Sequence, residues 1–352
     1  MKLFTPLRLR GMELKNRIAV SPMCEYSARD GHPTNWHLVH LGSRAVGGAA
    51  LVFTEATAVS AIGRISPADT GIYLDSHVDA WRPIVEFIRE HDAIAGIQLA
   101  HAGRKASTAV PWSGGAPINI QDGGWTAVAP SAIPFNTGYA APKALSITEI
   151  DQIVAEFDAA ARRAIQAGFQ VVEIHSAHGY LLHEFLSPLS NQRTDEYGGS
   201  FENRVWMLLR VAEAVRNIWP EEHPVFVRIS ATDWAENGWD LEQSVEVSRR
   251  LKGIGVDLID VSSGGAVPNV KIPLGPGYQV DFAATIRRET GIATGAVGMI
   301  SEAAQAETIV STGQADLVLL ARELLRDPYW PRRAAHELGV KIKAPVQYER
   351  AW

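Results

Sequence analysis

The sequence predicts an α/β protein of the (β/α)8 class, a TIM barrel formed as one domain over residues 1–352. Short apolar runs of β type alternate with longer segments of helical period along the whole chain. The apolar runs are nearly continuous, which is typical of parallel strands buried on both faces. There are eight such runs in 352 residues, and this number favours a closed barrel over a doubly wound open sheet.

The eight apolar runs are the expected barrel strands. They cover residues 17–21, 50–54, 95–99, 170–174, 225–229, 258–261, 293–296 and 317–320. Each is four or five residues long, and most are followed by a segment of helical period.

The expected helices lie between these strands. They cover residues 36–46, 76–91, 150–165, 201–218, 241–252, 281–289 and 301–311. The third has the clearest 3.6-residue period, with Ile150, Ile153 and Phe157 on one face. Thr148 and Asp151 have the spacing of a capping box at its start, and Gly168 is expected to end it.

Residues 107–143 interrupt the alternation after the third strand. The segment is rich in Pro, Gly, Ala and Trp and has no period long enough for a helix. A long loop of this kind is uncommon unless it is functional, so we expect a lid or subdomain over the barrel mouth. A variable surface loop is the alternative.

The composition excludes several classes of protein. The formal net charge is -6 and no block of one sign occurs, which disfavours a nucleic-acid binder. A single cysteine allows no internal disulfide and no Cys-rich metal site. No run of about 18 apolar residues and no export signal is present, so a cytoplasmic location is expected.

The working residues of a barrel lie at the carboxyl ends of its strands. The loops after the last two strands carry Gly295, Gly298 and Arg322, a pattern that predicts a phosphate site. Ordinary turn chemistry is the alternative for the two glycines. Neither a Gly-x-Gly-x-x-Gly nor a P-loop pattern occurs, so any nicotinamide would bind without a Rossmann domain.

His175, His178 and Tyr180 follow the fourth strand. The two imidazoles could ligate a metal, but such a site needs a further ligand aimed at the same point. They could instead donate hydrogen bonds to one carbonyl or phenolate oxygen, with Tyr180 as a proton donor. Satisfied polar residues at a strand end are the third interpretation.

Several long motifs resemble the old yellow enzyme family of FMN-dependent ene-reductases. They include Ser21-Pro-Met-Cys24, the segment 98–105 beginning Gln-Leu-Ala-His, the segment 173–188 containing His-Ser-Ala-His-Gly-Tyr, and Arg322-Glu-Leu-Leu-Arg-Asp-Pro. The match covers essentially the whole chain. Cys24 and the terminal segment 344–352 resemble the thermophilic-like bacterial branch, which includes a Bacillus member.

The resemblance implies noncovalent FMN, reduced by NADPH or NADH and reoxidised by an activated alkene in a ping-pong cycle. The alkene could be an enone, an unsaturated aldehyde, a maleimide, a nitroalkene or a quinone. The flavin-binding positions that it implies are Ser21, Pro22, Met23, Cys24, Ala56, Gln98, Arg228, Gly298 and Arg322. Arg228 would face the N1/O2 edge of the flavin, Gln98 its pyrimidine edge, and Arg322 its phosphate.

The resemblance also assigns roles around the substrate. His175 and His178 would bind the carbonyl oxygen, Tyr180 would protonate the α-carbon, and Tyr26 would contact the ligand. Lys105 is expected either near the flavin or as a solvated surface lysine. Arg350 would enter the site of a neighbouring subunit in a dimer or tetramer, with a frayed tail as the alternative. The competing enzyme hypothesis is a metal-dependent barrel hydrolase using His175 and His178, and the non-catalytic alternative is a binding protein for flavin or another phosphate-bearing ligand.

Overall fold

A computed structural model describes all 352 residues and contains a closed barrel of eight parallel strands. The strands in barrel order are β3 (Ile18–Val20), β4 (Leu51–Ala58), β5 (Ile94–Ala100), β8 (Val171–Ser176), β9 (Val225–Ser230), β10 (Leu258–Ser262), β11 (Ala293–Ala296) and β12 (Leu317–Leu320). β12 pairs with β3 through Val318 and Ile18, and this pairing closes the barrel. The predicted (β/α)8 fold is confirmed.

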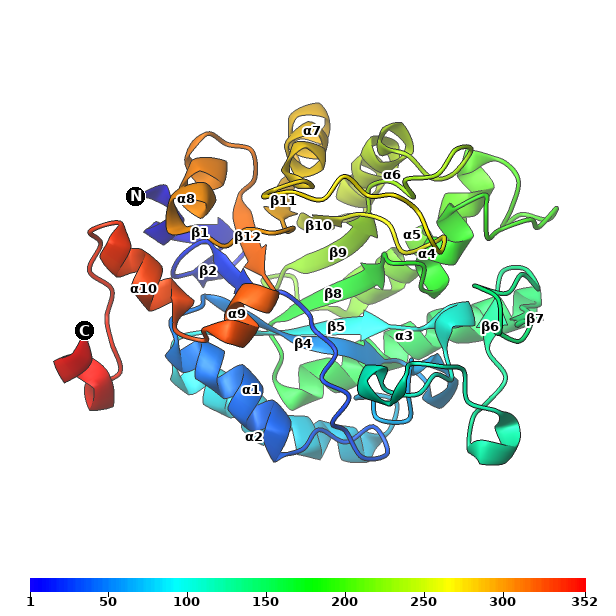
Figure 1. Cartoon of the computed structure of the whole chain (residues 1–352), viewed down its shortest axis with the longest axis horizontal. Helices are drawn as coiled ribbons and strands as arrows, with labels where there is room; N and C mark the ends of the chain where they lie inside the picture. Colours follow the sequence, from blue (N-terminus) through cyan, green and yellow to red (C-terminus); the bar gives the residue numbers. More distant parts are fainter.

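Helices surround the barrel, as Figure 1 shows. The helices that follow strands are α1 (Asn35–Val46), α2 (Asp75–Glu90), α3 (Ile147–Ala167), α5 (Phe201–Ile218), α6 (Leu241–Ile254), α7 (Val280–Thr290) and α8 (Ala303–Ser311). Three further helices are α4 (Leu181–Leu186), α9 (Arg322–Arg326) and α10 (Trp330–Glu337). No helix is long and apolar enough to cross a membrane.

The predicted capping box of α3 was wrong by two residues. Ser146 and Glu149 form it, because Glu149 N donates to Ser146 Oγ at 3.3 Å and Ser146 N donates to Glu149 Oε2 at 3.0 Å. Asp151 instead pairs with Arg210 of α5 at 2.6 Å. The end of the helix is as predicted, since Gly168 takes the left-handed conformation with φ of 92°.

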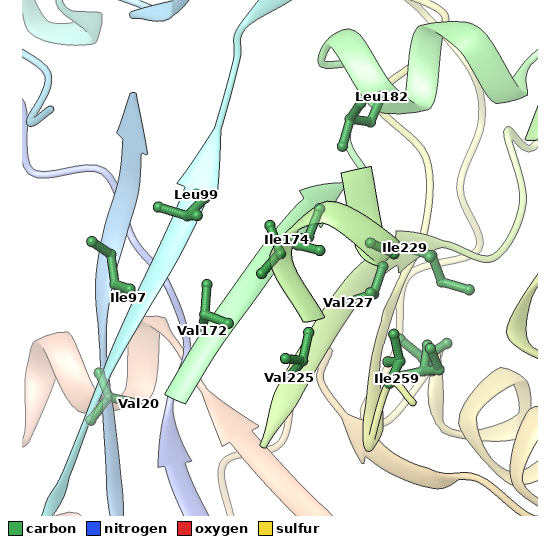
Figure 2. Packing of buried hydrophobic residues seen from close by; sticks show 14 of the residues in the cluster. Val20, Ile97, Leu99, Val172, Ile174, Leu182, Val225, Val227, Ile229 and Ile259 are labelled. Carbon is green, nitrogen blue, oxygen red and sulfur yellow. The ribbon is translucent and has the colours of Figure 1, made fainter. Parts of the chain in front are cut away.

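The core has two layers because successive strand residues face opposite sides. Val172, Ile174 and Val227 belong to the large cluster between the strands and the helices (Figure 2). Val171 and Phe226, each one position earlier, belong to a smaller cluster with Leu7, Leu9 and Leu14. These three leucines come from a hairpin of β1 (Leu7–Leu9) and β2 (Met12–Leu14). The hairpin was not predicted from the sequence.

The excursion at 107–143 lies between β5 and α3, as expected. It contains short 3-10 turns, and β6 (Val128–Ala129) pairs with β7 (Lys143–Ala144). Trp125 Nε1 donates to Ile62 O at 2.8 Å, and Arg193 Nη1 donates to Pro130 O at 3.0 Å. The excursion is therefore fastened to two other loops of the barrel. Figure 1 shows it on the side opposite the carboxyl terminus.

Candidate active site

The candidate site begins with inward-facing polar residues on three neighbouring strands. Along β8, Val171, Glu173 and His175 share one face, and the same alternation places Arg228 of β9 and Asp260 of β10 inside the barrel. His175 pairs in register with Arg228, which in turn pairs with Asp260. The amino-terminal half of the barrel is thus filled by apolar side chains, while its carboxyl half carries charge and imidazole.

His175 near the end of β8 and His178 and Tyr180 in the segment that follows lie close together in space. The ring centroids of His175 and His178 are 5.2 Å apart, and those of His175 and Tyr180 are 5.1 Å apart, both edge to face. His178 Nε2 shares a hydrogen bond of 2.7 Å with Ser262 Oγ. Nδ1 of His175 is buried and has no hydrogen-bond partner in the protein.

The protonation states of these residues suit hydrogen-bond donation without charge. Burial lowers the pKa of His175 and that of His178 well below the usual range, and the nearby Arg228 guanidinium lowers both further. Burial raises the pKa of Tyr180 well above its usual value. At neutral pH the two imidazoles are therefore neutral and the phenol keeps its proton.

Arg228 supplies positive charge inside the barrel. Its Nη1 donates to Ser21 Oγ at 3.2 Å, and its Nε lies 3.1 Å from Asp260 Oδ2. Gln98 Nε2 donates to Glu173 Oε1 at 2.8 Å. Burial raises the pKa of Glu173, and Asp260 raises it further, so the two carboxyls do not both carry a negative charge beside the arginine. The structure thus joins Arg228 to Ser21 and Gln98 to Glu173.

The segment after β3 reaches the same site. Cys24 and Tyr26 pack with Tyr180 and Trp125 against a small apolar cluster that contains Ile65. Tyr26 has a left-handed φ of 46°, and its ring meets that of Trp112 at 5.9 Å. Burial raises the pKa of the Cys24 thiol well above its usual value, so the thiol stays protonated. Pro22 and Met23 lie on the same half-buried stretch.

Ala56 lies beside Gln98 because of an irregularity in β4. The pairing between β4 and β5 shifts register between Phe53 and Ala56, after which Ala56 pairs with Gln98. β4 therefore continues to Ala58, four residues beyond the predicted end at Thr54. Ala56 is thus a strand residue at the carboxyl half of the barrel.

The predicted phosphate site is only partly as expected. Gly295 lies inside β11 and not in a loop, and a Cβ there would come within 2.4 Å of Leu319, so packing explains this glycine. Gly298 has φ of 119° in the loop after β11, where a Cβ would meet Gln279 at 2.8 Å. Arg322 is exposed at the start of α9 and forms no ion pair. Of the three residues predicted for the phosphate site, Gly298 and Arg322 are therefore the two that follow the carboxyl ends of β11 and β12.

Lys105 is not a solvated surface lysine. Its Nζ donates to His178 O at 2.9 Å and to Gly265 O at 3.3 Å, and it lies 5.1 Å from the centre of the Tyr180 ring. Burial lowers its pKa to about 8. Lys105 therefore holds the loop that carries His178 and Tyr180.

The structure does not bring Arg350 to the site of its own chain. Residues 346–351 form an exposed 3-10 turn in which Tyr348 approaches Tyr329. Figure 1 shows the carboxyl terminus on the side away from the excursion.

Sequence reasoning also missed Asp260 as the partner of Arg228. The period-two pattern of the strand could have revealed it, since Asp260 and Leu258 lie on the same face.

The arrangement suits an anionic ligand that carries hydrogen-bonding groups. Arg228 and Arg322 can neutralise negative charge, Gln98 can hydrogen-bond a heterocycle, and His175 has an unused buried nitrogen. No group of three or more His, Cys, Asp and Glu side chains is placed to hold a metal ion.

Comparison with known proteins gives a consistent picture. Residues 2–340 match the NADH:flavin oxidoreductase / NADH oxidase family. The chain is 53% identical to an NADPH dehydrogenase of Geobacillus sp. (strain WCH70), covering 99% of this chain and 98% of that one. It is 48% identical to an NADPH dehydrogenase of Bacillus subtilis (strain 168), covering 100% and 99%. Among solved structures it is similar to morphinone reductase, with 27% identity, a TM-score of 0.81, and coverage of 97% and 91%.

Proposed function

Because the chain belongs to the NADH:flavin oxidoreductase / NADH oxidase family, in which the old yellow enzymes fall, we propose a role for each residue of its active site. The protein is an FMN-dependent, NAD(P)H-oxidising enzyme that reduces activated C=C bonds. One observation carries the residue-level proposal: the buried, unpartnered Nδ1 of His175 lies in a ring packed between His178 and Tyr180.

The residues proposed to hold FMN lie in β4, β5 and β9 and in the segments that follow β3, β11 and β12. They are Ser21, Pro22, Met23, Cys24, Ala56, Gln98, Arg228, Gly298 and Arg322. Arg228 would place its charge beside the flavin edge that becomes anionic, and Arg322 would pair with the phosphate. Bound FMN supplies the hydride chemistry that no side chain of this protein can provide.

The residues proposed to act on the alkene are those at the end of β8. Neutral His175 and His178 would donate hydrogen bonds to the carbonyl oxygen and stabilise the negative charge that develops there. This withdraws electrons from the β-carbon. Tyr180, which keeps its proton at neutral pH, would deliver it to the α-carbon. Tyr26 would contact the bound ligand from the opposite loop.

The excursion at 107–143 is proposed as a lid over this site. Tyr26 meets Trp112 of the excursion, and the Lys105 Nζ lies 4.5 Å from the centre of the Phe135 ring. Because Tyr26 is proposed to contact the ligand, a substrate that displaces Tyr26 would also move Trp112 of the lid.

A dimer or tetramer is proposed, with Arg350 entering the neighbouring site. Two large aromatic residues flank the terminal arginine and are exposed in the single chain, Tyr348 at 42% and Trp352 at 51%. Exposed aromatic residues of this kind are common anchors of interfaces.

The cytoplasmic location stays a prediction, as does the ping-pong order of the two substrates.

The metal-dependent hydrolase is not favoured, because the whole chain matches a flavin oxidoreductase family.

The experiment that tests the proposed roles replaces Tyr180 with Phe and compares cyclohexenone with a quinone. A quinone takes its proton on oxygen, where exchange with water is easy, whereas the enone needs a proton on carbon. Tyr180→Phe should therefore lower the kcat for cyclohexenone by roughly 10²-fold or more and leave the quinone within a few-fold. An equal effect on both would contradict the role of Tyr180.

A further inference from the structure

The backbone of residues 178–180 is fixed by side chains from three other elements. His178 N donates to Ser230 Oγ at 2.9 Å, and the ammonium of Lys105 donates to His178 O at 2.9 Å. Gly179 N donates to His183 Nδ1 at 2.9 Å. Side chains thus hold three backbone groups of this segment: His178 N, His178 O and Gly179 N.

This restraint acts on a strained conformation. His178 has a left-handed φ of 61°, which costs about 1–2 kcal/mol for a residue with a side chain. Gly179 follows with φ of 72° and lies so close to the next loop that a Cβ would come within 2.1 Å of Gly265 O. A strained segment of this kind persists only where its surroundings determine it. The three clamping side chains therefore hold the backbone from which the rings of His178 and Tyr180 project, while Ser262 bonds the His178 ring itself.

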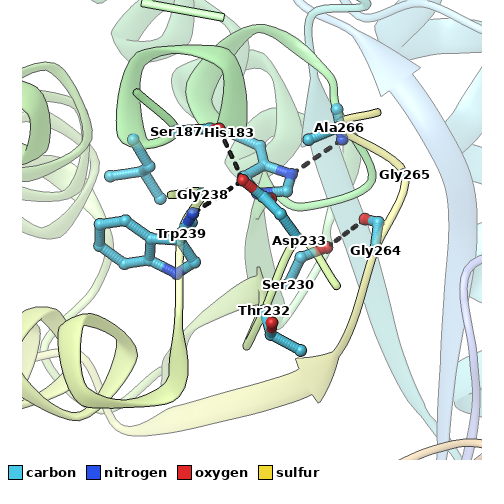
Figure 3. A network of polar contacts seen from close by, with 12 residues as sticks. His183, Ser187, Ser230, Thr232, Asp233, Gly238, Trp239, Gly264, Gly265 and Ala266 are labelled. Carbon is cyan, nitrogen blue, oxygen red and sulfur yellow. Dashed lines mark hydrogen bonds and ion pairs between the residues drawn. The ribbon is translucent and has the colours of Figure 1, made fainter. Parts of the chain in front are cut away.

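Only one of the three clamps depends on a tautomer. His183 Nδ1 accepts the Gly179 N–H, so Nδ1 carries no hydrogen, and the neutral ring must carry its hydrogen on Nε2. That Nε2 lies 2.9 Å from Asp233 Oδ1, and Figure 3 shows the two side chains next to each other. Both side chains are completely buried. Asp233 thus faces the only ring position where the hydrogen can be.

Asp233 is itself held as an acceptor. Its Oδ2 accepts from Ser187 Oγ at 2.6 Å and from Trp239 N at 2.8 Å. Burial raises the pKa of this carboxyl, but the contact with His183 and the hydrogen bonds from Ser187 Oγ and Trp239 N outweigh burial and hold the pKa below its usual value. An ionised Asp233 can only accept, and it therefore selects the Nε2–H form of His183.

We propose that His183, locked as the Nε2–H tautomer by Asp233, is a positioning residue that holds the Gly179 N–H and thereby orients His178 and Tyr180. The inference rests on the proposed roles of these last two residues. His183 does not touch the substrate and acts only through the backbone at Gly179.

A matched pair of variants separates positioning from stability. His183→Asn and His183→Leu both lose the contact with Asp233, but Asn places an oxygen where Nδ1 was and keeps an acceptor for Gly179 N–H. We expect both to unfold at lower temperature than the wild type. The kcat for cyclohexenone should fall about tenfold further in the Leu variant than in the Asn variant, since small misplacement of reacting groups is costly. Equal turnover in the two variants would overturn the proposal.

A spectroscopic measurement tests the tautomer without relying on activity. In protein labelled with 15N-histidine, the signal lost in His183→Asn identifies His183, and the wild type should show hydrogen on Nε2 only. In Asp233→Asn the amide oxygen must stay toward Trp239 N, so the amide NH2 faces His183 and forces the hydrogen onto Nδ1. With a hydrogen on Nδ1, the ring can no longer accept the hydrogen bond from Gly179 N–H. Ser187→Ala is the control and should keep the wild-type tautomer.

Two results would overturn the proposal in this measurement. One is a wild-type His183 with its hydrogen on Nδ1, and the other is an Asp233→Asn protein with the reversed tautomer and unchanged cyclohexenone turnover. Failure of the proposed function is distinguishable, because it would appear as a wild type that does not reduce cyclohexenone, whatever the tautomer of His183.

Discussion

The imidazole of His175 meets the ring of Tyr180 edge to face, with the two ring centroids 5.1 Å apart. The first residue lies in β8, and the second is the residue that precedes α4, so the strand end and the helix start place a hydrogen-bond donor beside a proton donor. Such a pair can grip a carbonyl oxygen and protonate a carbon of the same molecule.

Replacing His175 with Ala should slow alkene reduction strongly. Loss of one hydrogen-bond donor to a developing oxyanion typically costs about 2.7–4 kcal/mol, or roughly 10²–10³-fold in kcat. The measurement is steady-state reduction of cyclohexenone at saturating substrate. His336→Ala is the control, because His336 is exposed on α10 away from the barrel mouth. Unaltered turnover in His175→Ala would show that the residue does not polarise the carbonyl.

Replacing Arg322 with Ala should weaken flavin binding. Arg322 is exposed and forms no ion pair, so its charge is available for a phosphate. A charge-assisted hydrogen bond contributes about 1.5–3 kcal/mol, which corresponds to a Kd for FMN that rises roughly tenfold or more. Quenching of FMN fluorescence on binding to the apoprotein measures it. Arg326→Ala on the same helix is the control, since Arg326 pairs with Glu323, and an equal effect of both variants would exclude specific phosphate binding.

Acid should destabilise the protein partly through His101. Burial lowers the pKa of His101 to about 4, whereas an unfolded histidine titrates near 6.5. Between these values the unfolded chain binds more protons than the native one, so stability is present above pH 6.5 and is lost as the pH falls toward 4. The wild type should therefore lose about 3 kcal/mol more than His101→Asn between pH 7 and pH 4.

Urea unfolding at the two pH values measures this difference. Asn keeps an acceptor for Gly103 N, which donates to His101 Nδ1 at 3.1 Å in the native protein. Parallel pH dependence of the two proteins would mean that His101 is not held neutral by burial.

Mixing two inactive variants should restore activity if Arg350 crosses between subunits. Arg350→Ala lacks the arginine that would enter the partner's site, and His175→Ala lacks the polarising imidazole. In a hybrid dimer, the Arg350→Ala subunit keeps His175 and receives Arg350 from the His175→Ala subunit. Unfolding the two together and refolding them should give more cyclohexenone reduction than either alone. No gain, with hybrids shown to form, would argue against a shared site.

The barrel could be predicted from sequence because each buried strand is a near-continuous apolar run with a helix after it. The same pattern does not indicate the β1–β2 hairpin, because its Leu7, Leu9 and Leu14 alternate with charged residues. These leucines pack against apolar residues only where the barrel has closed above them. The cap of α3 was misplaced because Thr148 and Asp151 have the same spacing as Ser146 and Glu149, and the structure shows that Ser146 is the N-cap residue.

Residues of the candidate site could be predicted where they lie in the carboxyl half of a strand, as His175 does in β8 and Arg228 in β9. Gly295 was assigned to a loop because a glycine at a strand end resembles turn chemistry, yet the structure uses it to pack against Leu319. The link between His183 and Asp233 could not be predicted, since the two are 50 positions apart and meet only when the loop after β9 folds beside α4.

The most direct test of the central claim is an anaerobic titration of the purified protein followed by its visible spectrum. The account predicts a yellow protein that NADPH bleaches in proportion to its flavin content and that recovers its colour when cyclohexenone is added. A protein that contains no flavin and does not take up added FMN, or a yellow protein that NADPH does not bleach, would contradict it.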